Sequence, residues 1–276
     1  MTNNKQAIMV LGHGDNANVL QETIQILDNE NIDFFIHWDK KFKKPRLKSS
    51  KSKVQFVKSI NVTWGAESMM KAELMLMQAV QQSGKYAMMH LISSVDMPLM
   101  TSEYMLDYFS DGRSYLGFEY ASDDIPDDVI ERVKYYWPID NISLRDHKLY
   151  GKLIHKINKL FKVNRLKGCD LKLGKGPQWF SVNTKYLQKI LEFDKRPFLH
   201  TNCIDEMFMQ TILPELNSHS KRINDNVQAV RYIDWNRGTP YVFTMNDIQE
   251  LRDVVNTQYA FARKINNAKV IRSVFC

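Results

Sequence analysis

The sequence is poor in residues that cross-link a chain or anchor it in a membrane. It has three cysteines, Cys169, Cys203 and Cys276, which are far apart, odd in number and outside any Cys-x-x-Cys pair. This pattern argues against a disulfide framework and a structural zinc site, and it fits a reducing compartment. No run approaches the roughly 18 apolar residues of a membrane span, and the first residues do not resemble a signal peptide. We therefore expect a protein that neither crosses a membrane nor is secreted by that route.

The common nucleotide-binding signatures are also missing. "GHGDNANV" follows an apolar run but lacks the third glycine of Gly-x-Gly-x-x-Gly, and no P-loop is present. These absences argue against a dinucleotide dehydrogenase and a P-loop NTPase. The chain also has no Asp-x-Asp, the metal-binding pair that sugar transferases of the common α/β kind usually carry. A sugar transferase built on this chain would have to offset the charge of a leaving diphosphate without that metal.

The composition is that of an ordinary globular protein with a basic surface. The 276 residues are 44% hydrophobic and 25% charged, which is normal for a soluble domain. The net charge is +7 and the pI is about 9.1. Such a surface attracts nucleotides, nucleic acid, acidic lipids or anionic glycans, and charge alone does not choose among them.

The first half of the chain alternates strand and helix patterns. Short apolar runs at 7–13, 33–39, 54–60 and 86–94 predict strands, and residues 18–31 and 67–84 have helical periodicity. A further helix is expected to begin at Ser102 as its cap. Strand, helix and strand in succession indicate a parallel sheet. We predict an α/β fold with a mostly parallel central sheet flanked by helices.

The second half is less regular. We expect helices at 184–193 and 201–216, a strand at 230–235 and a C-terminal helix from about Met245. No convincing linker separates the halves, so we predict one domain over residues 1–276.

Polar residues follow several of the predicted strands. Leu11, Gly12 and His13 end the first strand, Asp39 follows the second, and Asp96 follows the central one. Open parallel sheets bind ligands beyond the carboxyl ends of their strands. A lone aspartate there is more often a turn residue, but the three strand ends together favour a nucleotide site.

A set of motifs in a fixed order carries a family resemblance. The motifs are "IHWDKK", "VTWGAESMMKAEL", "LISSVDMPLMTSEYM", "GPQWFSVNTKYLQKIL", "IDEMFMQTIL", "RYIDWNRGTPYVFTMNDIQEL" and "FARKI". With these motifs the chain, from about Ala7 to Ile265, resembles the β-1,6-N-acetylglucosaminyltransferase family, which includes the core-2/I-branching enzymes and the peptide O-xylosyltransferases, whereas residues 118–175 match nothing. The resemblance implies a GT-A-type (Rossmann-like) glycosyltransferase fold, a nucleotide-sugar donor and an inverting, metal-independent reaction.

The resemblance gives "IDEM" a catalytic meaning. It implies that Glu206 is the base that takes a proton from the acceptor hydroxyl, with Asp205 holding the helix start or positioning the sugar or acceptor. Without the resemblance, both residues read as first-turn acids of a helix. A helix N-terminus would also weaken Glu206 as a base, which a partly apolar pocket could offset.

The same resemblance also implies which residues contact the leaving diphosphate and the sugar. Lys264 matches the diphosphate-binding lysine. Arg237 lies near the family's arginine but one residue out of register, and Arg263 is its rival. Each of the three would otherwise be a surface cation. Trp235 matches an aromatic at the sugar site, and Trp179 is a weaker candidate beside it.

Residues 152–167 form a basic amphipathic segment, "KLIHKINKLFKVNRLK". It reads either as an ordinary surface helix or as a helix that lies on an anionic membrane. The basic loop 40–53 would be the best feature of a non-enzymatic protein that binds nucleic acid or membrane, but no nucleic-acid motif accompanies it. A transferase fold without activity is a third reading, which the retained Glu206 and Lys264 oppose.

The resulting expectation is a transferase that moves a sugar from a UDP-sugar to a hydroxyl of a glycan or lipid-linked glycan. UDP-GlcNAc is the first donor, with UDP-xylose and UDP-galactose behind it, and we expect no cofactor, metal or nucleic acid. Residues 1–110 would bind the nucleotide and residues 111–276 the acceptor. Eukaryotic members carry a Golgi anchor and disulfides, which this chain lacks. We therefore expect a bacterial, cytoplasmic enzyme of surface-polysaccharide synthesis, free or peripheral at the inner face of the membrane.

Overall fold

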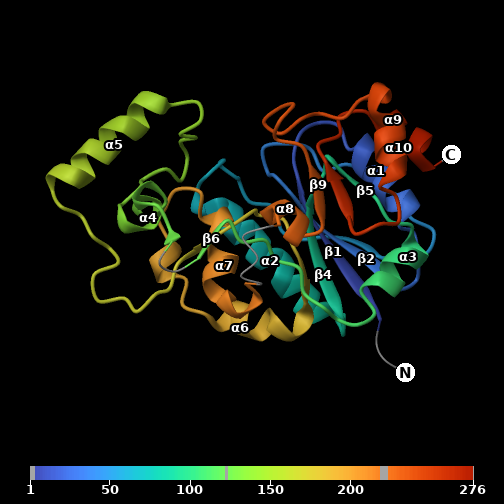
Figure 1. Cartoon of the computed structure of the whole chain (residues 1–276), viewed down its shortest axis with the longest axis horizontal. Helices are drawn as coiled ribbons and strands as arrows, with labels where there is room; N and C mark the ends of the chain where they lie inside the picture. Colours follow the sequence, from blue (N-terminus) through green and yellow to red (C-terminus); the bar gives the residue numbers. More distant parts are fainter. Residues whose placement is uncertain (1–3, 122–123, 218–222, 276) are drawn as a thin grey trace.

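A five-stranded sheet forms the centre of the molecule. The computed structural model describes residues 4–121, 124–217 and 223–275. The sheet has the order β3-β2-β1-β4-β8, and its first four strands are parallel while β8 is antiparallel to β4. The strands are β1 (Gln6–Gly12), β2 (Ile32–Trp38), β3 (Val54–Phe56), β4 (Met88–Ser93) and β8 (Ser181–Asn183). The predicted mostly parallel α/β sheet is confirmed, and Figure 1 shows its strands β1, β2 and β4 with helices around them.

Helices cover both faces of this sheet, which explains its nearly continuous apolar strands. Alternate residues of a strand point to opposite faces. Met9 and Phe35 pack in one core cluster with Met70 and Met77 of α2 (Glu67–Ser83). The opposite face packs against α1 (Asn18–Ile26) and α3 (Ser102–Tyr108) in a second cluster.

A second, three-stranded sheet extends the fold at the carboxyl end of β4. Its order is β5-β10-β9, with β5 (Asp96–Pro98), β10 (Phe261–Arg263) and β9 (Arg231–Ile233). β10 is antiparallel to β5 and sets Arg263 opposite Asp96. Helices α9 (Ile248–Asp253) and α10 (Ala268–Phe275) lie beside this sheet in Figure 1. The chain therefore returns near its C-terminus to the edge where β4 ends.

Most of the remaining elements lie on the α2 side and on an arm, and two short ones contact the second sheet or its helices. A two-stranded ribbon joins β6 (Tyr120–Ala121) and β7 (Gly174–Lys175). Between them lie α4 (Asp127–Lys134) and α5 (Lys148–Leu160), which projects from the body at the upper left of Figure 1. The short helices are α6 (Leu187–Glu192), α7 (Phe208–Ile212) and α8 (Asp225–Gln228). The 3-10 turns are η2 (Thr184–Tyr186), η3 (Arg196–Phe198), η4 (Ile204–Glu206), η5 (Pro214–Leu216) and η6 (Met245–Asp247).

Three sequence predictions fail in detail. The helix expected over 201–216 is divided into η4, α7 and η5, because Cys203 is left-handed with φ of 52° and Pro214 cannot continue the helical hydrogen bonds. The cap of α3 is Thr101, whose side chain accepts from the N–H of Tyr104, rather than Ser102. The expected C-terminal helix is interrupted by β10.

The structure also bears on the expectations about cysteines and about membrane spans. Cys169 and Cys203 are free thiols, whereas Cys276 lies outside the described residues. Among the described residues, no helix is both long enough and apolar enough to cross a membrane.

Candidate active site at the carboxyl edge of the sheet

The predicted nucleotide-binding residues lie together at one edge. The N–H of Asp39 donates to the carbonyl of Gly12 at 2.8 Å, and the N–H of Ser94 donates to the carbonyl of Leu11 at 3.2 Å. His13 lies within electrostatic range of Asp39 and Lys264. We call Leu11, Gly12, His13, Asp39 and Asp96, with Arg263 at the end of β10 and Lys264 just after it, the strand-end site. The sequence predicted this grouping, while the contact of each residue with a nucleotide stays a prediction.

The carboxylate of Asp39 already bonds to residues of nearby loops. This buried carboxylate accepts the N–H groups of Lys41 at 3.0 Å and Val62 at 3.4 Å. The ammonium of Lys41 pairs with the other oxygen at 3.2 Å. The turn function that a lone strand-end aspartate usually has is therefore present here, beside any contact with a ligand.

Asp96 fastens the two sheets together. The residue is 1% exposed, and its two carboxylate oxygens accept the N–H of Ser93 at 2.7 Å and the hydroxyl of Ser93 at 2.8 Å. Nη1 of Arg263 donates to the same carboxylate at 2.8 Å and to the Ser93 hydroxyl at 2.6 Å. Asp96 thus holds Ser93 and Arg263 in place, while its predicted action on the nucleotide donor stays a prediction.

Positive groups converge beside this anchor. Burial, Arg263 and Arg145 lower the pKa of Lys264. Its ammonium has no hydrogen-bond or ion-pair partner within residues 4–121, 124–217 and 223–275. Loss of water around the ring of His13, then the charges of Lys264 and Arg263, lower the pKa of that histidine. A neutral imidazole with Lys264, Arg263 and Lys41 in electrostatic range is a site that attracts an anion.

Arg237 lies in an acidic network of its own. It forms ion pairs with Asp234, with Asp247 at 3.3 Å and with Glu250 at 2.6 Å. Its guanidinium also lies 4.3 Å from the ring centre of Tyr241. These contacts fasten the 234–250 segment, so a diphosphate would have to compete with three carboxylates. Of the two arginines that the sequence left open, Arg263 is the one at the strand-end site.

The two predicted aromatic residues occupy different environments. Trp235 follows β9 and is 52% exposed, which leaves its indole face open to a sugar. Trp179 is buried, and the guanidinium of Arg263 lies 4.5 Å from its ring centre. Trp179 therefore supports a cation of the site.

Glu206 lies in a 3-10 turn that precedes α7. Its side chain is 38% exposed, and Oε2 accepts a hydrogen bond from Nη1 of Arg132 at 2.9 Å. α7 begins only at Phe208 and has five residues, so Glu206 precedes the helix instead of lying in its first turn. The charged neighbour is an arginine of α4.

Asp205 points the other way, into the protein. It is buried, and burial followed by the charge of Glu206 raises the pKa of Asp205 to about 7. The fully buried Glu73 of α2 lies within its electrostatic reach, and burial also raises the pKa of Glu73 well above its ordinary value. Gln178 donates to one Glu73 oxygen at 2.7 Å. The prediction that Asp205 caps the helix is wrong, because Cys203 and Met207 hold the cap positions. The burial of Asp205 also disfavours a direct contact with sugar.

One short segment links the acidic turn to the cations. The N–H of Cys203 donates to the carbonyl of Gly65 at 2.7 Å. The adjacent Trp64 lies beneath Arg145, 6.0 Å from guanidinium to ring centre. Arg145 in turn lowers the pKa of Lys264. Segment 64–65 therefore lies between a carboxylate that could take a proton and cations that could hold a diphosphate.

Comparison with known protein families decides what kind of enzyme carries this arrangement. The family model of the Core-2/I-Branching enzyme matches residues 7–253 of the chain. The chain belongs to this family. The family is made of glycosyltransferases with a GT-A-like fold, so the predicted enzyme class and fold are confirmed. A search of curated proteins found no match.

Membership settles one of the alternatives left open by the sequence. As a Core-2/I-branching enzyme, the protein is a glycosyltransferase that uses a nucleotide sugar and a glycan acceptor rather than a basic binding module. The match ends before Arg263 and Lys264. Their assignment therefore depends on the geometry of β10 and on the motif "FARKI".

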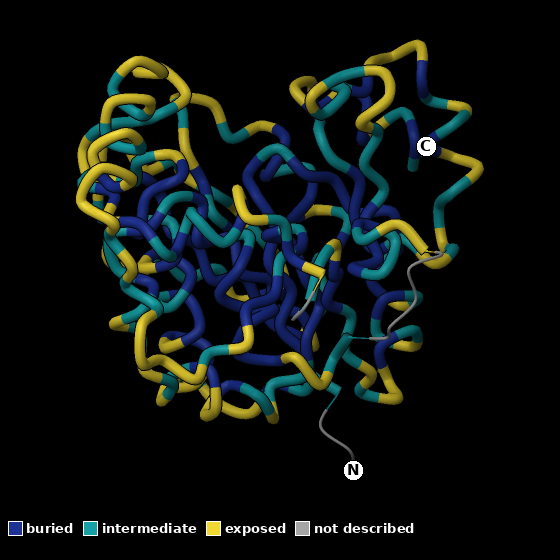
Figure 2. The backbone as a smooth tube through the Cα atoms, turned by 60° about the vertical axis from the view of Figure 1, so that its left-hand side comes forward, coloured by how far each residue is buried: buried dark blue, intermediate teal, exposed yellow. Residues whose placement is uncertain are grey.

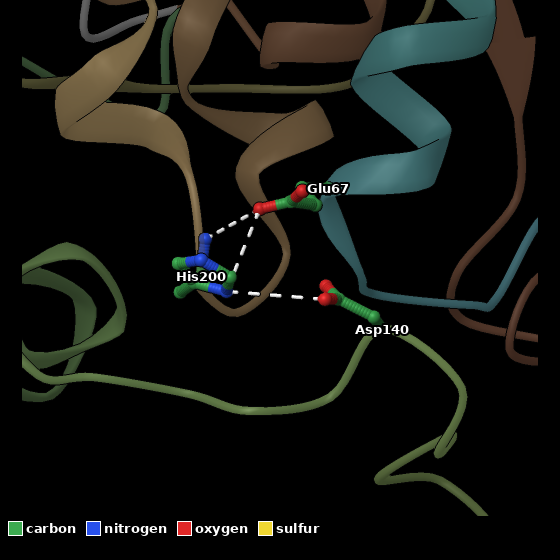
Figure 3. Close-up of side chains that lie close together, drawn as sticks. All are labelled: Glu67, Asp140 and His200. Atoms are coloured by element: carbon green, nitrogen blue, oxygen red, sulfur yellow. Dashed lines mark hydrogen bonds and ion pairs between the residues drawn. The ribbon is translucent and has the colours of Figure 1, made fainter.

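One histidine–carboxylate cluster in the transferase has metal-ligand residue types. Glu67, Asp140 and His200 offer atoms within 4.8 Å of one another, and Figure 3 shows them facing each other from α2 and two loops. Nδ1 of His200 lies 3.9 Å from both carboxylates. Glu67 already accepts the N–H of His200 at 2.6 Å and pairs with Lys71. These existing bonds satisfy Glu67 without an ion.

Two surface hollows of the transferase lie away from the strand-end site. One, of about 580 Å³, is lined by residues that include Asp28 and Lys48. The other, of about 500 Å³, includes Tyr86 and Thr184. None of the predicted site residues lines either hollow.

Sequence reasoning missed three residues of the site. Arg132 and Arg145 lie in the stretch that matched no family motif, and neither has a local signature. Glu73 sits within a methionine-rich helix whose pattern predicted only core packing. An acid inside that buried stripe was the one available signal, since Glu is rarely buried without a partner.

Proposed function

We propose that this transferase catalyses inverting, metal-independent transfer of a sugar, GlcNAc first, from a UDP-sugar to a glycan hydroxyl. The observation that carries the proposal is the pair Arg263 and Lys264 beside the carboxyl end of β4, with Arg145 in electrostatic range of the lysine, in a chain without Asp-x-Asp. Protein cations there would neutralise the charge that a metal ion offsets in other transferases.

Glu206 would act as the base. As the acceptor oxygen attacks the anomeric carbon, its proton passes to a Glu206 carboxylate oxygen. The bond from the anomeric carbon to the diphosphate oxygen breaks, and its electron pair leaves with the UDP. Attack opposite to the departing oxygen inverts the anomeric configuration. The partial exposure of Glu206 makes it accessible to an acceptor, and Arg132 orients it.

The leaving diphosphate would bind Lys264 directly. Lys264 lacks a competing partner among the described residues, and burial, followed by the charges of Arg263 and Arg145, lowers its pKa. An incoming phosphate relieves that repulsion. Arg263 would contribute its charge from a fixed position, since Asp96 and Ser93 hold its guanidinium. Arg237 would act on the diphosphate only after leaving its carboxylates.

The remaining assignments concern the sugar and the cellular setting. The exposed indole of Trp235 would stack on the apolar face of a sugar. We assign the acceptor to a glycan or lipid-linked glycan of bacterial surface polysaccharide, made on the cytoplasmic side and at the inner face of the membrane. UDP-xylose and UDP-galactose are the alternative donors of the same site.

The test is release of UDP from UDP-GlcNAc, UDP-xylose and UDP-galactose, with and without EDTA. The proposal expects turnover that EDTA leaves unchanged. Loss of activity in EDTA, restored by Mn²⁺ or Mg²⁺, would contradict metal independence. In that case His200→Ala would show whether the Glu67 cluster holds the ion, because the variant would then lose the restoration.

A further inference from the structure

Helix α5 exposes a row of large apolar side chains. Leu149 is 82% exposed, Leu153 55%, Ile157 41% and Leu160 75%, and Phe161 just beyond the helix is 72% exposed. The four helical positions are spaced so that they share one face. In Figure 2 the turns of this arm at the upper left are largely yellow, which marks them as exposed.

The charge around this row has one sign. Residues 147–169 contain seven lysines and arginines and no aspartate or glutamate. Lys152, Lys156 and Lys159 are exposed and lie along the flank of the apolar row. An apolar face bordered by lysines is typical of helices that lie in the interface of an anionic bilayer.

The opposite face of α5 is fixed to the body. Nδ2 of Asn158 donates to the carbonyl of Tyr136 at 3.0 Å, and Tyr150 donates to the carbonyl of Pro138 at 3.1 Å. Tyr150 and Ile154 pack on the cluster of Tyr135, Trp137 and Ile139. The apolar row therefore points outward because the other side of the helix is already packed.

We propose that α5 is a membrane-docking helix, whose Leu149–Leu160 face enters an anionic lipid surface while its lysines contact the headgroups. A second copy of the chain fits the face less well. A symmetric pair would bring the same acid-free, seven-cation segment against itself. Charge complementarity thus selects a negatively charged partner, and the apolar row selects lipid.

α5 is also connected to the proposed base. Nε2 of His155 pairs with Glu131 of α4 at 2.8 Å, and the next residue, Arg132, pairs with Glu206. If the proposed function holds, docking through α5 places the Glu206 side of the enzyme toward a membrane-borne acceptor. The docking itself does not require that function.

Co-sedimentation with vesicles tests the proposal. The intact protein should sediment with vesicles that mix phosphatidylcholine and phosphatidylglycerol at low salt, and should remain in solution with phosphatidylcholine alone. Lys152→Glu with Lys156→Glu should weaken partitioning about tenfold or more, since each lysine near an anionic surface contributes about 1 kcal/mol. Leu153→Ser with Leu160→Ser should also weaken it. The matched control is Lys43→Glu with Lys51→Glu, which makes the same charge change on the basic loop 40–53.

Three outcomes would overturn the proposal. The first is no sedimentation with anionic vesicles at low salt, and the second is equal loss in the α5 and control variants. The third is a dimer in solution that the leucine variants convert to a monomer. All the changed side chains are exposed, so circular dichroism and melting curves should match the wild type. UDP release without vesicles is measured in parallel, so failure of docking and failure of transfer are separable.

Discussion

Arg132 donates a hydrogen bond from Nη1 to Oε2 of Glu206 at 2.9 Å, and this pair joins α4 to the turn that precedes α7. The sequence raised the problem of how a carboxylate at a helix N-terminus remains a base. In the structure the helix begins after the carboxylate, and the group that acts on Glu206 is an arginine 74 positions earlier. A contact of this kind orients the carboxylate and leaves its second oxygen for an acceptor.

Glu206→Gln should lower kcat by about a hundredfold to ten-thousandfold, because the amide keeps the shape but cannot take a proton. UDP binding, measured by calorimetry, should stay close to that of the wild type. Glu215→Gln is the matched control, since Glu215 is an exposed acid paired with Lys189 outside the site. A fully active Glu206→Gln enzyme would remove Glu206 as the base.

Arg132→Ala should lower kcat by about ten- to a hundredfold, because an unheld carboxylate samples misaligned positions. Arg132 is a positioning residue, so KM for the donor should change little and Arg132→Lys should restore part of kcat. Steady-state kinetics separate the two parameters. A rise in donor KM with unchanged kcat would assign Arg132 to donor binding instead.

The strand-end site was predictable because two strong signals coincide there. Buried parallel strands read as continuous apolar runs, and polar residues after Gly12, Trp38 and Ser93 marked their carboxyl ends. Strands that align in parallel bring those ends to one edge without any further information. The position of Leu11, His13, Asp39 and Asp96 along the sheet thus followed from local pattern alone.

The acidic turn was predicted less well because its backbone depends on distant contacts. The apolar run after Glu206 suggested one helix, yet Phe208–Ile212 are buried on every side, so periodicity had no exposed face to show. The left-handed Cys203 is fixed by a bond to Gly65 far away in sequence. Arg132 and Glu73 reach the turn by tertiary packing, which leaves no local pattern.

Lys264→Ala should weaken UDP binding roughly ten- to a hundredfold, since a hydrogen bond to a charged group contributes about 1.5–3 kcal/mol. UDP affinity is measured by calorimetry at moderate salt. Lys269→Ala, an exposed lysine in α10, is the control and should bind UDP normally. Unchanged affinity in Lys264→Ala would reject the diphosphate role.

The buried Asp205 predicts a stability that falls with rising pH. Its pKa is raised from an ordinary 3.8 to about 7 by burial and by Glu206. Between these values the folded state holds a proton that the unfolded state releases, so this contribution is complete below about pH 4 and lost by about pH 7. The difference corresponds to on the order of 4 kcal/mol.

Asp205→Asn should remove that loss, because an amide does not titrate and can donate to the nearby Glu73 carboxyl. Urea unfolding at pH 5 and pH 8 should show the variant gaining on the wild type as the pH rises. Asp170→Asn, at an exposed position, should show no such trend. An equal pH dependence in Asp205→Asn and the wild type would mean that Asp205 does not carry it.

Gly12 has a packing function that is separable from any contact with nucleotide. A Cβ at this position would lie 2.1 Å from Cε3 of Trp38, and the Trp38 side chain is fully buried and cannot swing away. Gly12→Ala should therefore destabilise the fold by about 1–3 kcal/mol through overpacking, measured by urea unfolding. Gly151→Ala in α5, where the nearest atom is 3.3 Å away, should be neutral or stabilising.

The decisive comparison for Gly12 is a double-mutant cycle with Trp38→Leu. If the clash is the cause, the alanine will cost much less in that background, and UDP affinity of the folded fraction will be retained. Additive costs, or a loss of UDP binding at full stability, would instead show that Gly12 is required for the nucleotide to approach.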